Sequence, residues 1–308
     1  MSTPLRLPET YSLLGEPLYP TPIRLWLPKD PAEYEAKLRE LGENREKAAH
    51  EWLESPDDPE KLLWFARRTE ILGNFNEACA IYSEGMTRWP EDPRFPRFRG
   101  HRFALLRRLD LAVADLERAA HLIEGRPDEP EVYASGGPSR DKLGFSSFHW
   151  NVWYHLGFAR FAAGDLAGAA EAYRRCMEVC DGRESVVATT HWLYMPLIRL
   201  GRLEEAERLL EGIKPGESLI EVGDYYETLL MYKGTSTPEA LLKKARSEGK
   251  VRFVTRAHAV GSLYIARGEF EKAVKVFREI QDTGEWSAGV HLLAEAELLH
   301  LSNSRLKQ

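Results

Sequence analysis

Hydrophobic and small residues recur along this chain with a period of about 34 residues, and each period has the same internal order. A glycine or its substitute is followed two positions on by an apolar residue, then by alanine, then by an aromatic residue or leucine. In one copy these positions hold Gly164, Leu166, Ala169 and Tyr173. The copies lie at residues 59–92, 93–126, 150–183, 187–220 and 254–287. This order predicts a pair of helices in each copy.

The predicted first helix of each pair has its apolar positions on one face, at the spacing of about 3.6 residues per turn that an α-helix requires. Alanine in the second helix lets the two helices approach closely. A single pair leaves one buried side uncovered, and stacking against the next pair covers that side. The pattern therefore predicts an all-α fold in which helix pairs stack into a curved solenoid.

The same order resembles the tetratricopeptide repeat family, in which W-x2-L-G in the first helix precedes small and aromatic positions in the second. The third copy carries Trp153, Leu156 and Gly157 at these places, whereas Thr190 and Ala257 stand where later copies would have tryptophan. The resemblance covers five copies, over half of the chain. It implies a right-handed α-α superhelix whose first helices line a concave surface.

The segments around the copies fit the same architecture. Asp30 is a candidate helix cap and Pro31 a candidate first helical residue, so residues 31–54 are expected to form an N-terminal helical hairpin. Residues 221–253 are expected to form a degenerate hairpin. The expected divisions of the chain are a single solenoid over residues 31–302, a final helix within it over residues 287–302, and a tail at residues 303–308.

Two segments are rich in residues that prevent regular helix. Residues 127–149 are expected to form an insertion loop, for which mobility and a role as a functional flap are both open. Residues 1–30 are expected to be extended, because prolines alternate with bulky apolar side chains over residues 13–28. We expect this segment to pack against the solenoid, with the concave surface as one location. A disordered tail is the alternative.

Composition narrows the class of protein. The 308 residues carry a formal net charge of -6, which disfavours nucleic acid or an anionic membrane as the main partner. The start of the chain lacks a signal-peptide pattern and no later run is long enough to span a membrane, so a cytoplasmic location is expected. Cys79, Cys176 and Cys180 make no closed set of disulfides and share no ligand spacing with histidines. No cofactor or metal is expected.

The face opposite the apolar stripe of each first helix is expected to line the concave groove. The candidate binding residues on this face are Arg67, Arg94, Arg97, His101, Asn151, Tyr154, Phe158, His191, Met195 and His258. Large apolar side chains left exposed there would each forgo about 1.5–3 kcal/mol of burial, so we expect something to cover them. An extended segment of a partner protein would do so, as would residues 1–30 of this chain. A solvated face that is basic and aromatic by chance is the alternative.

Arginines in the run 93–108 suit an anionic group. The run has six arginines and no acidic residue, and Arg97 with Arg67 or Arg94 would hold a carboxylate or a phosphate. Solvated surface arginines are the alternative. The best known peptide clamp of the resembled family needs a lysine where this chain has Leu63, so that mode of binding is not predicted.

An enzyme in the same groove is the alternative class of function. His101 or His191 could carry a proton with Tyr154 as a donor, but no nucleophile elbow, P-loop or dinucleotide motif is present. Zinc needs ligand atoms at about 2.0–2.1 Å, and the groove histidines are expected on separate helices. The prediction is a non-catalytic scaffold that binds a protein or a peptide. An enzyme, or a binder of a small anionic ligand, remains the alternative.

Overall fold

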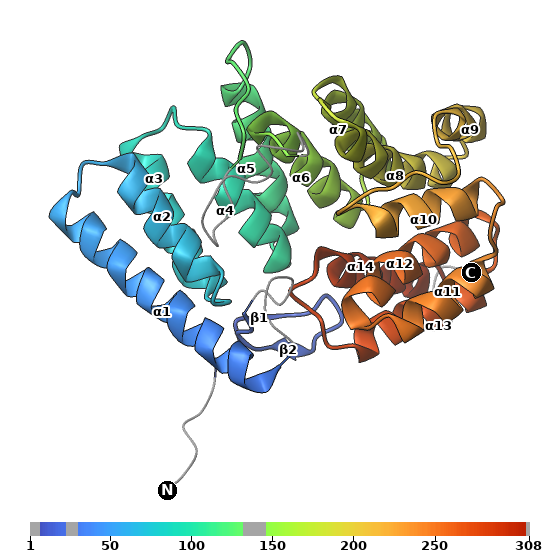
Figure 1. Cartoon of the computed structure of the whole chain (residues 1–308), viewed down its shortest axis with the longest axis horizontal. Coiled ribbons are helices and arrows are strands. Elements are labelled where there is room, and N and C mark those ends of the chain that lie inside the picture. The colour runs from blue at the N-terminus through green and yellow to red at the C-terminus, as the bar shows by residue number, and fades with distance from the viewer. Residues whose placement is uncertain (1–6, 23–29, 132–145, 306–308) are drawn as a thin grey trace, which may run out of the picture. The chain divides into compact units, whose positions relative to one another are not determined.

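The computed structural model describes residues 7–22, 30–131 and 146–305 of the chain. The fold is all-α, as predicted, and is built from stacked helix pairs (Figure 1). Two compact units are present: within the described ranges, the first holds the residues up to Pro127 and the second holds those from Asp128 onward. None of the described helices combines the length and the apolar character needed to cross a membrane.

The first unit combines a bundle of helices with a small β-hairpin. Its described helices are α1 (Pro31–Glu54), α2 (Pro59–Glu70), α3 (Phe75–Arg88), α4 (Arg94–Leu105) and α5 (Leu109–Leu122). Strands β1 (Thr10–Tyr11) and β2 (Pro17–Leu18) pair antiparallel, with Thr10 opposite Leu18. The pairs α2–α3 and α4–α5 lie where the first two copies of the repeat are predicted. Their shared core includes Leu62, Tyr82 and Phe98.

Residues 31–54 form one continuous helix, so the hairpin predicted there is wrong. The cap is as predicted: the Asp30 carboxylate accepts hydrogen bonds from the backbone amides of Ala32 and Glu33, and Pro31 lies in the first turn. Gly42 lies inside the helix, with open space around it. One glycine costs a helix about 1 kcal/mol relative to alanine. The alanine, leucine, glutamate, lysine and arginine residues around it favour helix strongly enough to offset that cost.

Part of the N-terminal segment lies against turns of the first unit. Thr10 Oγ1 donates a hydrogen bond to the carbonyl oxygen of Leu106, at 2.7 Å. The backbone of Thr21 covers Gly73, which has a positive φ of 86° and no room for a side chain. These contacts are at the turns that follow α4 and α2. Two segments were expected to lack helix. In the N-terminal segment, residues 1–6 and 23–29 lie outside the described residues, and in the insertion loop, residues 132–145 do.

The second unit contains the remaining helices. In its described residues these are α6 (Phe148–Ala162), α7 (Leu166–Glu178), α8 (Arg183–Arg199), α9 (Leu203–Glu211), α10 (Gly223–Tyr232), α11 (Pro238–Ser247), α12 (Lys250–Ala266), α13 (Phe270–Asp282) and α14 (Gly289–Arg305). Helices α10 and α11 occupy the region of the predicted degenerate hairpin. The final helix begins at Gly289, slightly later than the expected Ser287.

The small positions of the repeat are the places where aromatic rings pack. A side chain at Gly157 in α6 would meet the ring of Tyr173 in α7. A side chain at Gly261 in α12 would likewise meet the ring of Phe277 in α13. Each glycine therefore lets a ring of the second helix lie against the backbone of the first, which holds the two helices of a pair close together.

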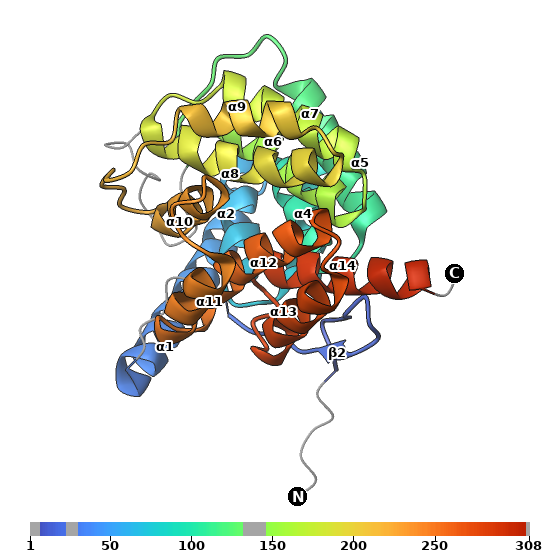
Figure 2. The same cartoon turned by 90° about the vertical axis from the view of Figure 1, so that its right-hand side faces the viewer.

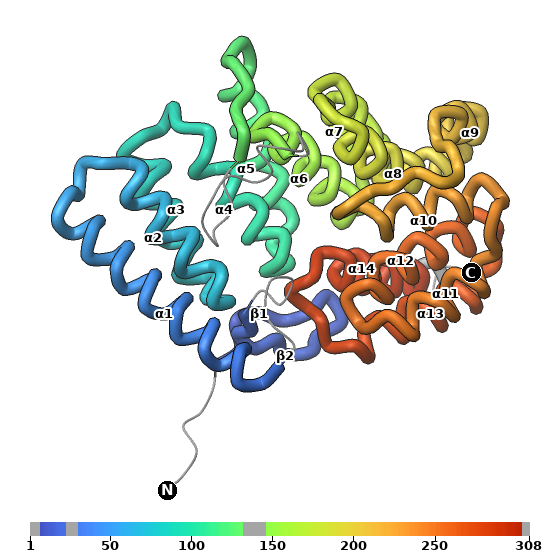
Figure 3. Tube along the Cα trace, in the orientation of Figure 1, coloured from blue at the N-terminus to red at the C-terminus, as the bar shows by residue number. Residues whose placement is uncertain are grey.

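The leading helices of the second unit also pack against one another across the stack. Helix α12 packs against α8 and α10, and α14 packs against α6 and α12 (Figures 2 and 3). At the start of α14, a side chain on Gly289 would meet the ring of Phe158 in α6. Farther along, Arg199 of α8 forms a buried ion pair with Glu297 of α14. The inner faces of these helices are therefore interior surfaces of the unit.

Candidate binding site

The candidate binding residues are divided between the two units. The first unit contains Arg67, Arg94, Arg97 and His101, and the second unit contains Asn151, Tyr154, Phe158, His191, Met195 and His258. The two groups have different surroundings. In the second unit most of them belong to the interior. In the first unit Arg67 and Arg97 join a cluster of arginine and aromatic side chains, and Arg94 and His101 have other partners.

The prediction of an open groove in the second unit is wrong at Phe158, His191, Met195 and His258, which are all buried. His191 and His258 are each 1% exposed, and Met195 is fully buried. Phe158 is 5% exposed because the start of α14 lies against its ring. The physical reason is that α12 and α14 return across the stack and cover the faces that the periodicity leaves uncovered.

His191 is held by hydrogen bonding and stacking inside this seam. Its Nδ1 lies 2.6 Å from Thr228 Oγ1, which also donates to the carbonyl oxygen of Tyr225 at 2.6 Å. The imidazole stacks on the Tyr225 ring, with centroids 4.6 Å apart. Tyr225 in turn reaches the Tyr154 hydroxyl at 3.3 Å. Burial, and next the nearby His258, lower the pKa of His191 to about 3, so the ring is neutral.

His258 lies among rings and lacks a polar partner. Neither of its ring nitrogens has a hydrogen-bond partner among the described residues. Phe161, Trp192 and Phe277 surround it, with centroids 6.0, 6.4 and 5.9 Å from the imidazole. Burial is the main cause that lowers the pKa of His258 to about 3. This histidine is therefore a neutral interior group, enclosed away from solvent.

Asn151 has a local role in α6. Its Nδ2 donates to the carbonyl oxygen of Ser147 at 2.9 Å and also to the Ser146 hydroxyl. The backbone carbonyl oxygen of Asn151 lies 2.7 Å from Nδ1 of His155. These bonds secure the first turns of the helix. The side-chain amide nitrogen of Asn151 is thus used inside the unit.

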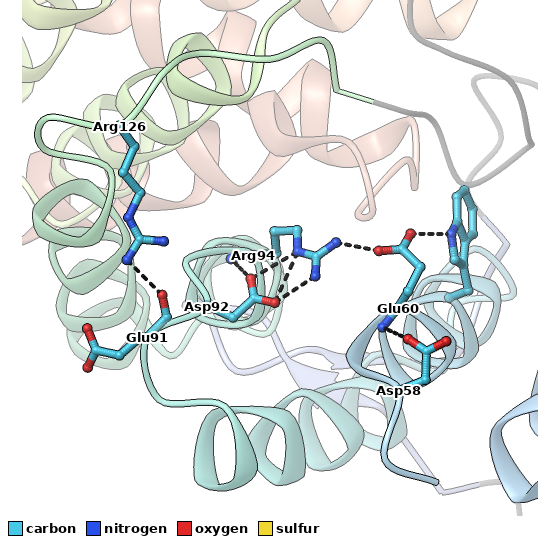
Figure 4. Close-up of polar contacts among 7 residues, drawn as sticks. Asp58, Glu60, Glu91, Asp92, Arg94 and Arg126 are labelled. Carbon is cyan, nitrogen blue, oxygen red and sulfur yellow. Dashed lines mark hydrogen bonds and ion pairs between the residues drawn. The ribbon is translucent and has the colours of Figure 1, made fainter. Parts of the chain in front are cut away.

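In the first unit, Arg94 is neutralised by two carboxylates. Its guanidinium donates to Asp92 at 2.7–3.2 Å and forms an ion pair with Glu60 (Figure 4). Trp64 Nε1 donates to the same Glu60 carboxylate at 2.8 Å. Burial alone would lower the pKa of Arg94, but the bonds to Asp92 and Glu60 outweigh it and raise that pKa. Arg94 therefore offers little uncompensated charge to a ligand.

The other arginines of this region alternate with aromatic rings. Arg67 Cζ lies 5.0 Å from the centroid of the Trp64 ring and 4.4 Å from that of Phe98. Arg68 also lies over Trp64, at 5.0 Å, and Arg97 lies over Phe98, at 4.3 Å. We call these five residues the arginine–aromatic ladder. Such contacts attract a cation to the face of a ring without neutralising its charge.

Arg67 is at the centre of the ladder, and it is 5% exposed. Its guanidinium makes no hydrogen bond or ion pair with any residue in the described part of the chain, and its Nε is enclosed without an acceptor. The positive charge of Arg67 also acts on the neighbouring Arg68. Its pKa is lowered, first by burial and next by the charge of Arg67.

His101 does not join the ladder. Arg102 Nη2 donates to its Nδ1 at 2.6 Å, and Arg102 also faces Glu70, with its Nε at 3.5 Å. Glu70 accepts a hydrogen bond from the buried Tyr82 hydroxyl at 2.8 Å. His101 is thereby tied to the polar network of the core of the first unit.

Sequence reasoning missed Trp64, Arg68 and Phe98 as members of the site. The spacing signal was available, because Trp64 precedes Arg67 and Arg68 by one helical turn and such residues are neighbours on a helix surface. Phe98 follows Arg97 directly and belongs to another helix from Trp64. Its place in the ladder depends on how α2 packs against α4, which spacing along one helix does not show.

Two cavities of the second unit lie away from all candidate residues. One of about 670 Å³ lies between α10 and α11, and Tyr226, Leu230 and Leu241 line part of it. The other, of about 400 Å³, lies over Leu193 and Leu197 of α8, between α7 and α9. Across the described ranges, no group of three or more histidine, cysteine, aspartate or glutamate side chains has the arrangement of a metal site.

Comparison with known proteins supports the repeat. Residues 151–179 match the family model described as tetratricopeptide repeat. No curated protein sequence matches the chain.

Among solved structures, a tetratricopeptide repeat protein from Parabacteroides merdae has 14% identity and a TM-score of 0.51, and the match covers 85% of this chain and 94% of that one. YrrB, described as a tetratricopeptide repeat protein with an unusual peptide-binding site, has 14% identity and a TM-score of 0.45, over 83% of this chain and 97% of that one. The first likeness shows the fold. The chain thus has a fold of the tetratricopeptide type, and residues 151–179 match one tetratricopeptide repeat.

Proposed function

We propose that this protein is a non-catalytic scaffold that binds a segment of a partner protein through the arginine–aromatic ladder of its first unit. The observation that carries the proposal is the gathering of Trp64, Phe98 and three arginines from two neighbouring repeats. Tryptophan and arginine are the residue types enriched among those that contribute most to binding energy at protein interfaces.

The second unit supports this choice by contrast. His191 and His258 are buried where α8 packs against α12, so a partner would have to separate those helices to reach them. An acid–base enzyme would need one of these histidines to meet its substrate. Trp64 of the ladder is partly exposed, so a partner can contact its ring without any helix moving.

The proposal is tested with a displayed library of random peptides selected on the full chain. Peptides that bind wild type should lose about tenfold or more in affinity for Trp64→Ala, measured by titration calorimetry. The matched control is Trp153→Ala in the second unit, a partly buried tryptophan that also contacts an arginine, Arg175, at 5.2 Å. That variant should retain wild-type affinity. Selection that enriches no binding peptide, or equal losses for both variants, would overturn the proposal.

A further inference from the structure

The first helix of each pair in the second unit is followed by a glycine with a positive φ, namely Gly164, Gly201, Gly234 and Gly268. About two helical turns earlier, α6 has Gly157 and α12 has Gly261, and a ring of the second helix lies against each, so these two pairs are closed. At the same place α8 has Tyr194 and α10 has Glu227. The two cavities described above lie at these pairs, which lack the small residue.

Glu227 changes how α11 attaches to α10. A larger side chain at this position keeps a ring from reaching the backbone of α10, and α11 has Leu242 where α13 has Phe277, at the same spacing of buried residues. The Glu227 carboxylate instead accepts a hydrogen bond from Lys244 Nζ of α11, at 2.7 Å. Helices α10 and α11 each pack against α12 and contact each other only slightly. This pair is therefore open.

The cavity of about 670 Å³ follows the face of α10 that is left uncovered. Gly223, Tyr226, Glu227 and Leu230 line it, at the spacing of one face of a helix. Residues 217–219 and 235–236, from the loops before and after α10, line it as well, so a loop bounds each end. A cavity bounded at both ends suits a small molecule better than an extended chain. Small-molecule sites usually have volumes of about 300–1,000 Å³.

The charged groups that line the cavity already have partners. Besides its bond to Lys244, the Glu227 carboxylate lies 3.2 Å from Nη2 of Arg256. Glu217 accepts a hydrogen bond from Nη2 of Arg183 at 2.6 Å, and the bonding to Arg183 lowers the pKa of Glu217. A charged ligand would have to compete with these pairs or lose water without gaining a partner. The cavity therefore suits a neutral ligand.

We propose that this cavity binds a small neutral molecule with an aromatic body and a hydroxyl or carbonyl group. The ring of Tyr226 and the side chains of Leu230 and Leu241 offer aromatic and apolar surface to such a body. The body would cover the face of α10 that the second helix covers in the closed pairs. Ser218 and Ser236 line the two ends, and their hydroxyls can donate to or accept from the polar group. The inference is independent of the proposed function, because the ladder belongs to the first unit.

The test uses the full chain and two naphthalene compounds of matched shape in titration calorimetry. 2-Naphthol is neutral at pH 7 and carries one hydroxyl group, whereas 2-naphthoate carries a negative charge. We expect 2-naphthol to bind, and we expect the affinity of 2-naphthoate to be lower by about tenfold or more, because its charge gains no partner in the cavity. Absence of 2-naphthol binding would overturn the inference, as would equal or tighter binding of 2-naphthoate.

Gly223→Leu fills part of the cavity. Gly223 lines it and has open space around it, so a side chain there meets no other atom at its Cβ. The substitution should weaken 2-naphthol binding about tenfold or more, since the leucine takes volume that the ligand needs. Gly42→Leu is the matched control, because Gly42 of α1 also has open space around it and lies in the first unit. It should change the affinity by less than about twofold. Equal losses for the two variants would contradict the proposed site.

A measurement on wild type covers the case in which Gly223→Leu disturbs α10. The methyl NMR resonances of Leu230 and Leu241 should shift when 2-naphthol is added, because the ring of the ligand acts on the methyl groups beside it. The methyl resonances of Leu193 and Leu197, which line the smaller cavity, should shift less. Larger shifts at Leu193 and Leu197, or no shift at any of the four, would place the compound elsewhere and overturn the inference.

Discussion

The Glu9 carboxylate accepts a hydrogen bond from the backbone amide of Asn76, at 2.5 Å, in the first turn of α3. Asn74, the residue in the cap position of that helix, makes no side-chain cap bond. The Asn76 side chain completes the contact by donating to the Glu9 carbonyl oxygen at 2.6 Å. A residue far away in the sequence thus supplies the cap of α3, and an anion near a helix N-terminus is favourable.

Replacing Glu9 with alanine should therefore lower the free energy of unfolding of the first unit by about 1 kcal/mol, the usual cost of a lost helix cap. This free energy is measured by denaturant unfolding, with circular dichroism as the signal. Glu16→Ala is the matched control, because Glu16 belongs to the same segment and is exposed. Equal effects for the two variants would contradict the capping role of Glu9.

Gly73 and Gly164 form a matched pair with positive φ values of 86° and 83°. A side chain at Gly73 would collide with the backbone of Thr21, whereas Gly164 has open space around it. Gly164→Ala should cost only the backbone strain, about 1–2 kcal/mol. Gly73→Ala should cost more and should also increase the proteolysis of the N-terminal segment, measured by limited digestion. If Gly73→Ala is no worse than Gly164→Ala, the segment does not pack there in solution.

The two buried histidines predict a loss of stability in acid. Burial lowers the pKa of both His191 and His258 to about 3, below the unfolded value of about 6.5. Between these values the unfolded chain binds more protons, so stability that is complete above about pH 6.5 is lost as the pH falls toward 3. Each histidine contributes a slope of up to about 1.4 kcal/mol per pH unit in this range.

His258→Phe should reduce this acid slope by about one histidine's contribution, measured by denaturant unfolding at several pH values. Ser262→Ala is the control, because Ser262 lies one turn away on α12, is fully buried and does not titrate in this range. An unchanged slope in His258→Phe would show that this histidine is not held neutral in the folded protein.

At neutral pH, His258→Phe should maintain or raise the free energy of unfolding. The substitution keeps a ring against Phe161, Trp192 and Phe277 and removes two nitrogens that have no partner among the described residues. Replacing an unpaired buried polar group by an apolar one of similar shape is neutral or stabilising. A fall of more than about 1 kcal/mol in the free energy of unfolding would instead indicate that a buried water forms hydrogen bonds with the ring nitrogens of His258.

The local pattern was enough to locate most helices and the close contacts within pairs. Gly157 and Tyr173 were recognised as repeat positions, and they meet in the structure. Asp30 was recognised as a cap and acts as one. The hairpin expected over residues 31–54 is wrong, because the residues around Gly42 favour helix strongly enough to continue through it.

By itself, the sequence determined which face of each leading helix is apolar, because periodicity is a property of a single helix. Only the tertiary structure decided what covers the opposite face. His191 and His258 share that face with Arg67 in the repeat pattern, yet α12 packs against α8 and encloses the two histidines in the second unit. The physical reason is that small rotations between successive repeats add along the stack and bring distant helices together, and no single repeat encodes that sum.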